Sequence, residues 1–378
     1  MTSSVTVQQR QKERPASPPP RIAPKGRLAA LDGLRLLAAL MVVLYHYIAF
    51  NSAAWSKPAT ERFPVAYVPA SYGWLGVQLF FLISGFVICM SAWGRDIGDF
   101  AVSRVTRLYP AYWFAVLAAT VVVSIWPVNG VGPSLSDVAV NLTMFHEPMK
   151  AAPADGVYWT LWVEIRFYLL FALLIAWKGL TYRRVVGFCV VWAMAAAVAA
   201  GLDVDALDAV LMPNDCWFFI AGMAFYLMYR YGPNMLLWGI VAATFLAGQH
   251  FAFNTHHNVQ KYVGHKLPLW PTVMLLALFY AAIAAVALGK TSRINWRWLP
   301  TAGALTYPLY LLHERIGWTV IKEFENDISR YVLVPALVVL MMVASWLLHR
   351  YLERPLARVL KRGMTKALAD MRAPRERV

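Results

Sequence analysis

Long apolar runs separated by short polar connections are the dominant pattern along this 378-residue chain. An apolar stretch of about 20 residues is long enough to cross a bilayer as a helix. The apolar stretches lie near 28–50, 72–93, 108–128, 158–177, 184–201, 214–231, 235–252, 271–289, 299–320 and 331–351. The pattern therefore predicts an all-α polytopic membrane protein, a bundle of about ten transmembrane helices.

The composition supports this reading. Hydrophobic residues make up 60% of the chain and charged residues only 15%, whereas a soluble domain is about half apolar and a quarter charged. Cys89, Cys189 and Cys216 all fall in apolar stretches. We interpret them as small core residues rather than a redox or metal-binding set.

The formal charge of +15 raises the question of a nucleic-acid partner, which the distribution of the charges answers. Most Lys and Arg lie before the first span, near 95–107, 178–184, 230 and 290–297, and from 350 onward. The alternate connections hold only Lys57, Arg62, Lys150, Lys261, Lys266, Lys322 and Arg330. This asymmetry predicts cytoplasmic termini and contact with anionic lipid of the plasma membrane, and no nucleic acid.

The chain divides into a transmembrane domain at 28–356 and two flanking segments. Residues 1–27 have no apolar run and predict a disordered, basic cytoplasmic leader, and 357–378 predict a basic cytoplasmic tail. The connection 129–157 contains apolar positions at helical spacing, which predict a short interfacial or re-entrant helix acting as a lid or an anchor. Histidines in the connection 253–270 lack partners at ligand spacing, so no metal is predicted.

Two ionisable residues stand within the first apolar stretch. Arg35 and His46 are separated by ten residues, so in a regular helix they leave on nearly the same face, ~16 Å apart along the axis. Ionisable groups at membrane depth are costly and normally face a bundle interior or a wet cavity. The pair therefore marks a candidate functional site.

Position along the helices sorts the other polar groups into an inner and an outer set. Asp32 and Arg35 begin the first helix, and the loop before the third supplies the remaining inner residues, Arg104, Arg107 and Tyr109. In the outer half, Glu164, His46 and His313 lie at similar depths and are expected to meet in one pocket.

The outer set suggests acid–base chemistry. A histidine beside a buried carboxylate has a fixed tautomer and a pKa suited to proton transfer, so His46 is the candidate general base and Glu164 its orienting group. The alternative is that these residues only brace neighbouring helices. Tyr307, Tyr310 and His313 follow at three-residue intervals and predict a polar lining.

The inner set suggests anion binding. Guanidinium groups are well shaped to grip phosphates, so Arg35, Arg104 and Arg107 are candidate phosphate ligands. The alternative is a charge pair at 104 and 107 that sets topology and reaches lipid headgroups.

Several motifs, in this order, resemble those of the acyltransferase 3 family of integral membrane acyltransferases. They are LDGLRLLAALMVVLYH, GVQLFFLISGF, RVTRLYP, YWTLWVEIRFYL, TYPLYLLH and YLERP. The resemblance covers roughly 28–356 and implies a ten-helix core, an acyl-CoA donor, and functional roles for Arg35, His46, Arg104 and Arg107. Two positions depart from the family pattern, because Gln78 replaces an Asp and Ile165-Arg166 replaces Glu-Gln after Glu164.

These observations together predict a membrane acyltransferase. It would move an acyl group, by default acetyl, from cytoplasmic acyl-CoA to a hydroxyl of an envelope or exported glycan, with His46 as base or acyl relay and Glu164 and His313 as further catalytic groups. Asp32, Tyr109, Tyr307 and Tyr310 are the candidate substrate-binding residues, and no permanently bound cofactor is expected. Two alternatives are acylation of a small metabolite such as a macrolide, and a proton- or anion-coupled transporter.

Overall fold

The computed structural model describes residues 28–128, 132–202 and 204–372, and within them every regular element is a helix. Each of the predicted apolar segments contains a helix. The long helices are α1 Ala29–Leu44, α4 Gly76–Ala92, α5 Ile97–Ile125, α7 Trp159–Lys178, α8 Tyr182–Leu202, α10 Cys216–Tyr231, α11 Met235–Val263, α12 Trp270–Ala287, α13 Leu299–Phe324, α14 Arg330–Leu348 and α15 Arg354–Arg372. The predicted leader lies outside the described residues.

Short helices occupy the connections. They are α2 Ala59–Arg62, α3 Tyr67–Ala70, α6 Leu135–Asn141 and α9 Asp205–Leu211, with 3-10 turns η2 Gly73–Leu75 and η3 Gly156–Tyr158 and π-helical turns η1 Tyr45–Ala49 and η4 His349–Glu353. α6 confirms the short helix predicted within 129–157. The predicted connection 253–270 is wrong in part, because α11 continues to Val263.

Nine helical regions of the described chain are long and apolar enough to cross a membrane, so the protein is a multi-pass membrane protein. α13 is not among them although its 26 residues would extend ~39 Å. Its polar and charged residues lower its hydropathy, and it packs against α1, α5 and α14. α13 is therefore a polar helix inside an apolar bundle.

Small residues allow three helices of the bundle to approach closely. A Cβ on Gly76 of α4 would lie 2.9 Å from a methyl of Val42 on α1, and one on Gly85 would lie 2.9 Å from the carbonyl carbon of Phe219 on α10. Real Cβ contacts are longer than this, so only glycine permits this spacing. α4 therefore packs closely against both α1 and α10.

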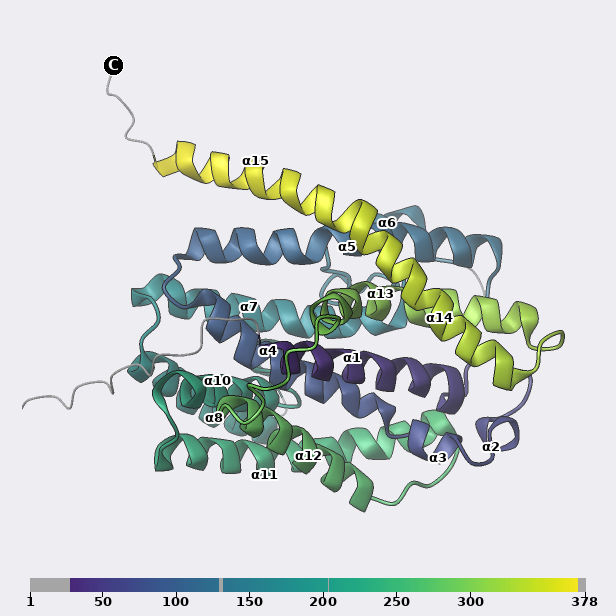
Figure 1. Ribbon diagram of the computed structural model, residues 1–378, viewed down its shortest axis with the longest axis horizontal. Helices are drawn as coiled ribbons and strands as arrows, with labels where there is room; N and C mark the ends of the chain where they lie inside the picture. Colours follow the sequence, from purple (N-terminus) through teal and green to yellow (C-terminus); the bar gives the residue numbers. More distant parts are fainter. Residues whose placement is uncertain (1–27, 129–131, 203, 373–378) are drawn as a thin grey trace, which may run out of the picture.

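The long helices give the bundle two distinct ends. In Figure 1, α1, α5, α7 and α11 run along the long axis of the molecule, and the short helices α2 and α3 lie at the end away from the terminus of α15. We call the end with the starts of α1 and α13 the basic end. The other, formed by 50–66 and 325–329, we call the opposite end.

α14, η4 and α15 form one continuous helical region from Arg330 to Arg372. α15 continues beyond the bundle beside α5 (Figure 1), and Arg372 pairs with Asp96 at 2.8 Å. The predicted tail is therefore regular helix as far as Arg372.

Candidate active site

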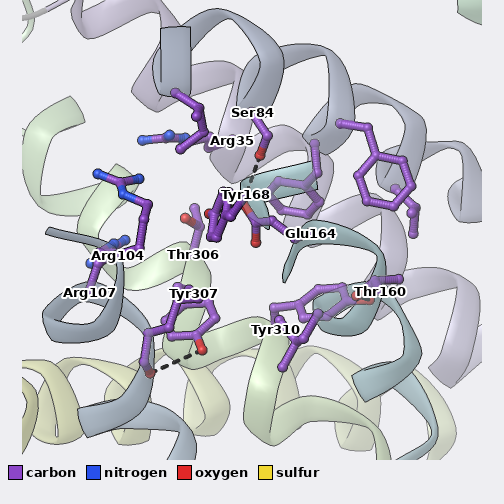
Figure 2. Close-up of a pocket in the computed structure, with 16 residues that line it drawn as sticks. Arg35, Ser84, Arg104, Arg107, Thr160, Glu164, Tyr168, Thr306, Tyr307 and Tyr310 are labelled. Carbon is purple, nitrogen blue, oxygen red and sulfur yellow. Dashed lines mark hydrogen bonds between the residues drawn. The ribbon is translucent and has the colours of Figure 1, made fainter. Parts of the chain in front are cut away.

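A cavity of about 120 Å³ lies inside the bundle between α1, α4, α5, α7 and α13. Figure 2 shows Arg35, Arg104 and Arg107 on one side, Thr160 and Tyr310 on the other. The structure therefore brings together the three arginines predicted to bind phosphate. Arg104 and Arg107 lie on α5 itself rather than in a preceding loop, because α5 begins at Ile97, where Asp96 caps it by accepting from the Asp99 N–H at 2.9 Å.

Carboxylates hold two of the three arginines in place. Arg107 donates to Oε1 of the buried Glu353 at 2.7 Å, and the other oxygen of Glu353 bonds His349 Nδ1 at 2.9 Å. Arg35 lies 3.9 Å from Asp32, one turn earlier on α1. Because each carboxylate engages its arginine from outside the cavity lining, the guanidinium groups are fixed with one side toward the cavity.

Glu164 is the carboxylate that lines this cavity, together with the arginines. Its Oε1 accepts hydrogen bonds from the hydroxyls of Ser84 at 3.0 Å and Tyr168 at 2.5 Å. The guanidinium group of Arg104 lies 5.7 Å from the centre of the Tyr168 ring. With three arginines against one carboxylate, the lining carries excess positive charge and suits an anionic ligand.

A second, larger cavity of about 740 Å³ lies at the basic end, beside the first. It is lined by the start of α13, from Pro300 to Ala304, and by Trp346, His349, Arg350 and Arg354. Arg35 and Arg107 line both cavities. These two side chains therefore form the wall between a wide basic cavity and the narrow pocket deeper in the bundle.

His46 lies in the π-helical turn η1 that follows α1, and it contacts His313 of α13. His46 Nδ1 is 2.9 Å from the carbonyl oxygen of Val42 and 3.1 Å from His313 Nε2. His313 Nδ1 is 2.7 Å from the carbonyl oxygen of Tyr310. A π-helical turn inside a helix widens the backbone locally and is often found at functional sites.

The hydrogen bonds assign the tautomers of both rings. His313 Nδ1 must donate to the Tyr310 carbonyl, so in the neutral ring His313 Nε2 is an acceptor. His46 Nδ1 faces two acceptors, His313 Nε2 and the Val42 carbonyl, and must therefore carry the hydrogen. The lone pair of His46 then resides on Nε2, which bonds no residue that the structure describes. His46 Nε2 is thus available to take a proton.

The prediction that Glu164 orients His46 is wrong. The groups that hold His46 are the Val42 carbonyl and His313, whereas Glu164 bonds Ser84 and Tyr168 in the arginine-lined cavity. The error arose in the depth of α7. Asp155 and Tyr158, just before this helix, are fully buried, so α7 begins inside the bundle and Glu164 lies deeper than its position in the sequence indicates.

Tyr310 lies between the arginine-lined cavity and the histidine pair. Its side chain lines the cavity, and its ring centroid is 5.6 Å from that of His313. Its hydroxyl is 2.8 Å from Thr160 Oγ1 and donates to the Val157 carbonyl at 3.2 Å. Tyr310 therefore connects the pocket wall to the pair that contains the candidate base.

The other predicted substrate-binding residues take different positions. Tyr307 lines the cavity beneath Arg107. Asp32 is buried against Gly303 of α13, and the Tyr109 hydroxyl donates to the Thr143 carbonyl at 3.0 Å; neither lines the cavity. Both therefore hold helices and connections around the site.

Three residues of the C-terminal helical region belong to the site but were not predicted to. Glu353 fixes Arg107, and Arg350 and Arg354 line the large cavity. The motif YLERP includes or adjoins all three residues. It lies more than two hundred residues from Arg107 in the sequence, so their proximity in space could not be predicted from it. Among the described residues no group of three His, Cys, Asp or Glu side chains is placed to hold a metal ion, and His256 uses both ring nitrogens for Thr272 and Leu267.

The comparison with known families agrees with the geometry of the site. The model of the acyltransferase 3 family, described as an acyltransferase domain, matches residues 28–350. The chain belongs to this family. The arginine-lined cavity and the histidine pair both lie within the matched residues, so the resemblance inferred from the motifs is confirmed.

Similar proteins carry the names of acyltransferases. Acyltransferase MdmB of Streptomyces mycarofaciens is 26% identical over 398 residues, covering 93% of this chain and 96% of that protein. O-acetyltransferase OatA of Staphylococcus aureus is 28% identical over 172 residues, 39% of this chain and 24% of that protein. YrhL of Bacillus subtilis, whose name describes a peptidoglycan O-acetyltransferase, is 35% identical over 101 residues, 25% of this chain and 13% of that protein. No solved structure matches the chain.

Proposed function

We propose that this acyltransferase moves an acyl group from acyl-CoA, bound at the basic end, to a hydroxyl group that reaches His46 from the opposite end. The observation that carries the proposal is the shared wall of Arg35 and Arg107 between the two cavities. On the far side of the inner cavity stands Tyr310, which bonds His313. The arrangement supports a route from a basic surface cavity to the inner cavity, where Tyr310 in the far wall contacts the histidine pair.

The donor fits this route by charge and by size. The phosphates and nucleoside of CoA would occupy the cavity of about 740 Å³, which lies within the usual range for ligand pockets of ~300–1,000 Å³. Arg350 and Arg354 there, and Arg35 and Arg107 at its inner wall, supply planar donors for phosphate oxygens. The narrow cavity of about 120 Å³ would then receive only the thin pantetheine arm and its thioester.

Proton transfer at His46 completes the reaction. His46 Nε2 takes the proton of the acceptor hydroxyl as the oxygen attacks the thioester carbonyl. The new C–O bond forms, the C–S bond breaks, and the departing CoA sulfur takes the proton back from His46. The imidazolium formed in between keeps its Nδ1 hydrogen bonds to the Val42 carbonyl and His313.

An acyl relay on His46 would use the same nitrogen. In that route His46 Nε2 attacks the thioester first: the N–C bond forms, the C–S bond breaks, and CoA leaves as a thiolate that takes a proton from water. The acceptor oxygen then forms the C–O bond, the N–C bond breaks, and the hydroxyl proton passes to water. Rapid mixing with acetyl-CoA alone distinguishes the routes, because a burst of about one CoA per protein identifies the relay. No burst from a protein that transfers acetyl groups identifies direct transfer.

The acceptor in this proposal is a glycan, and the group transferred is acetyl. The names of OatA and YrhL support acetyl transfer to oxygen, and that of YrhL supports a saccharide acceptor. The position of His46, in the turn that leads to the opposite end, supports an acceptor that arrives from outside the cytoplasm. The positive-inside distribution of Lys and Arg supports a cytoplasmic basic end.

The deciding experiment follows radiolabel from acetyl-CoA in membranes that contain the wild-type protein, His46→Ala or His250→Ala. His250 is an exposed histidine on α11 and serves as the matched control. Glycans, lipids and small molecules are extracted and counted separately. We expect label in the glycan fraction, reduced about 10²- to 10⁴-fold by His46→Ala and unchanged by His250→Ala.

Other outcomes contradict the proposal in distinct ways. Label in the small-molecule fraction alone would show that the acceptor is a soluble molecule and not a glycan, with the same acyl transfer. Full labelling by His46→Ala would show that His46 takes no part in the reaction. No labelling in any fraction, together with no binding of CoA to the purified protein, favours a transporter.

A further inference from the structure

A separate cavity of about 390 Å³ lies at the opposite end. One wall is the segment after η1, with Trp55, Lys57 and Arg62, and the other is the connection 325–329 together with the first residues of α14, Arg330 and Tyr331. Phe63 and Tyr331 pack edge to face beside it with ring centroids 5.9 Å apart. Nothing in the donor route described above uses this cavity.

Arg62 is the unusual residue of this cavity. Its side chain is only 2% exposed, yet none of its three guanidinium nitrogens forms a hydrogen bond within the described part of the chain. The guanidinium group lies 4.7 Å from the centre of the Trp55 ring. Burial lowers the pKa of Arg62 to about 10, against the opposing effect of the Glu325 carboxylate. A buried cation without hydrogen bonds is costly, and an anion that bonds it removes that cost.

The acidic residues at the cavity do not supply an anion that forms a hydrogen bond with Arg62. Glu325 directs its Oε2 at Ser56, accepting from the backbone N–H at 2.9 Å and from the hydroxyl at 3.2 Å. Lys57 and Arg330 add positive charge at the rim, where Asp327 is the other carboxylate. The cavity therefore has more basic than acidic groups, and its most buried group is a cation.

Hydrogen bonds connect this cavity to the candidate base. The Trp55 indole N–H donates to the carbonyl of Tyr47 at 3.1 Å, and the Tyr47 hydroxyl donates to the carbonyl of His313 at 2.7 Å. Tyr47 follows His46 directly in η1. A ligand held against Trp55 is therefore held by the same turn that positions the base.

From this geometry we infer that the cavity binds an anionic saccharide, the acyl acceptor, through a carboxylate or phosphate group on Arg62. That the saccharide is the acyl acceptor rests on the proposed function. The inference adds that this acceptor is anionic. A guanidinium group takes a carboxylate or phosphate in a two-pronged hydrogen bond. Glu325 and Ser56 supply polar groups for sugar hydroxyls, and the exposed ring of Tyr331 supplies an apolar surface.

The test uses the full chain in nanodiscs of phosphatidylcholine, with glucuronate as the anionic probe and glucose as its neutral counterpart. Calorimetric titration measures the affinity of each sugar for the wild-type protein, Arg62→Gln and Arg62→Lys. Arg297→Gln, at an exposed arginine of the connection before α13, is the matched control. We expect the wild-type protein to prefer glucuronate at least about tenfold, as one charge-assisted hydrogen-bonded pair provides.

The variants separate binding at Arg62 from general charge effects. Arg62→Gln should abolish the preference, Arg62→Lys should retain part of it, and Arg297→Gln should leave it unchanged. Lys57→Gln, at the exposed rim, should weaken glucuronate binding without affecting the buried side chains. This variant keeps the test informative if Arg62→Gln fails to fold.

Three results would overturn the inference. These are no preference for glucuronate in the wild-type protein, a preference that survives Arg62→Gln, and Arg62-dependent binding of glycerol 3-phosphate without binding of glucuronate. The last result would assign the cavity to a lipid headgroup. Glucuronate binding in a protein that transfers no label would overturn the proposed function alone, and transfer without any Arg62-dependent preference would overturn this inference alone.

Discussion

His313 Nε2 accepts a hydrogen bond from His46 Nδ1 across 3.1 Å, joining α13 to the π-helical turn after α1. The bond fixes which nitrogen of His46 carries the lone pair. The other nitrogen of His313, Nδ1, is already committed to the carbonyl of Tyr310, so the orientation of the His313 ring is fixed as well.

Replacing His313 with Phe should lower kcat by about 10- to 100-fold. The change removes one hydrogen bond to an imidazolium, worth ~1.5–3 kcal/mol, while the Val42 carbonyl still orients His46. Steady-state kinetics should show an unchanged KM for acyl-CoA. A loss as large as that of His46→Ala, or a raised KM with normal kcat, would contradict a positioning role for His313.

Glu353→Gln should weaken acyl-CoA binding. Glu353 is buried and holds Arg107, whose side chain is 37% exposed, at the wall between the two cavities, and losing a hydrogen bond between charged groups costs ~1.5–3 kcal/mol. We expect KM for acyl-CoA to rise about tenfold or more and the protein to unfold at a lower temperature. Glu323→Gln, at an exposed position near the end of α13, is the control and should change neither.

Glu164→Gln should alter donor binding and leave the basicity of His46 unchanged. Glu164 is the carboxylate among the arginines of the inner cavity, and the amide keeps an acceptor for Ser84 and Tyr168. Removing its charge should strengthen binding of CoA phosphates. The measurement is the pH dependence of kcat together with CoA affinity, and a shifted pH profile with unchanged affinity would restore Glu164 as the partner of His46.

Gly303→Ala should destabilise the contact between α1 and α13. A Cβ at this position would lie 2.6 Å from the Cβ of Asp32, and overpacking of a buried contact costs about 1–3 kcal/mol. Gly187→Ala is the matched control, because nothing lies within 4 Å of its added Cβ, and helix propensity favours alanine by ~1 kcal/mol. Thermal unfolding should show a lower midpoint for the first variant and an equal or higher one for the second.

The helices could be predicted from the lengths of the apolar segments. A segment that crosses the bilayer must form all its backbone hydrogen bonds within itself, and the thickness of the bilayer sets how long the helix must be. The sequence also grouped Arg35, Arg104 and Arg107, which the structure brings to one cavity, while phosphate binding by them stays a prediction. Arg35 lies in the first two turns of α1, and Arg107 lies within α5, which begins at Ile97. The two side chains meet because both α1 and α5 line the inner cavity.

Glu164 shows where such reasoning fails. Its depth was counted from the apparent end of an apolar run, but the buried residues Asp155 and Tyr158 carry the chain into the bundle before α7 begins. Hydropathy does not distinguish a connection at the surface from one that folds inward and finds partners there, as Asp155 does on the Arg315 N–H at 3.0 Å. The pairing of Arg107 with Glu353 was likewise invisible, because it depends on which helices are neighbours.

The continuous helical region from Arg330 to Arg372 has one further consequence. It begins beside the cavity that contains Arg62, passes the donor cavity at Arg350 and Arg354, and ends on α5. Because one helical region lines both cavities, Arg330 and Tyr331 at one cavity and Arg350 and Arg354 at the other stand at a separation that is set by the helix itself.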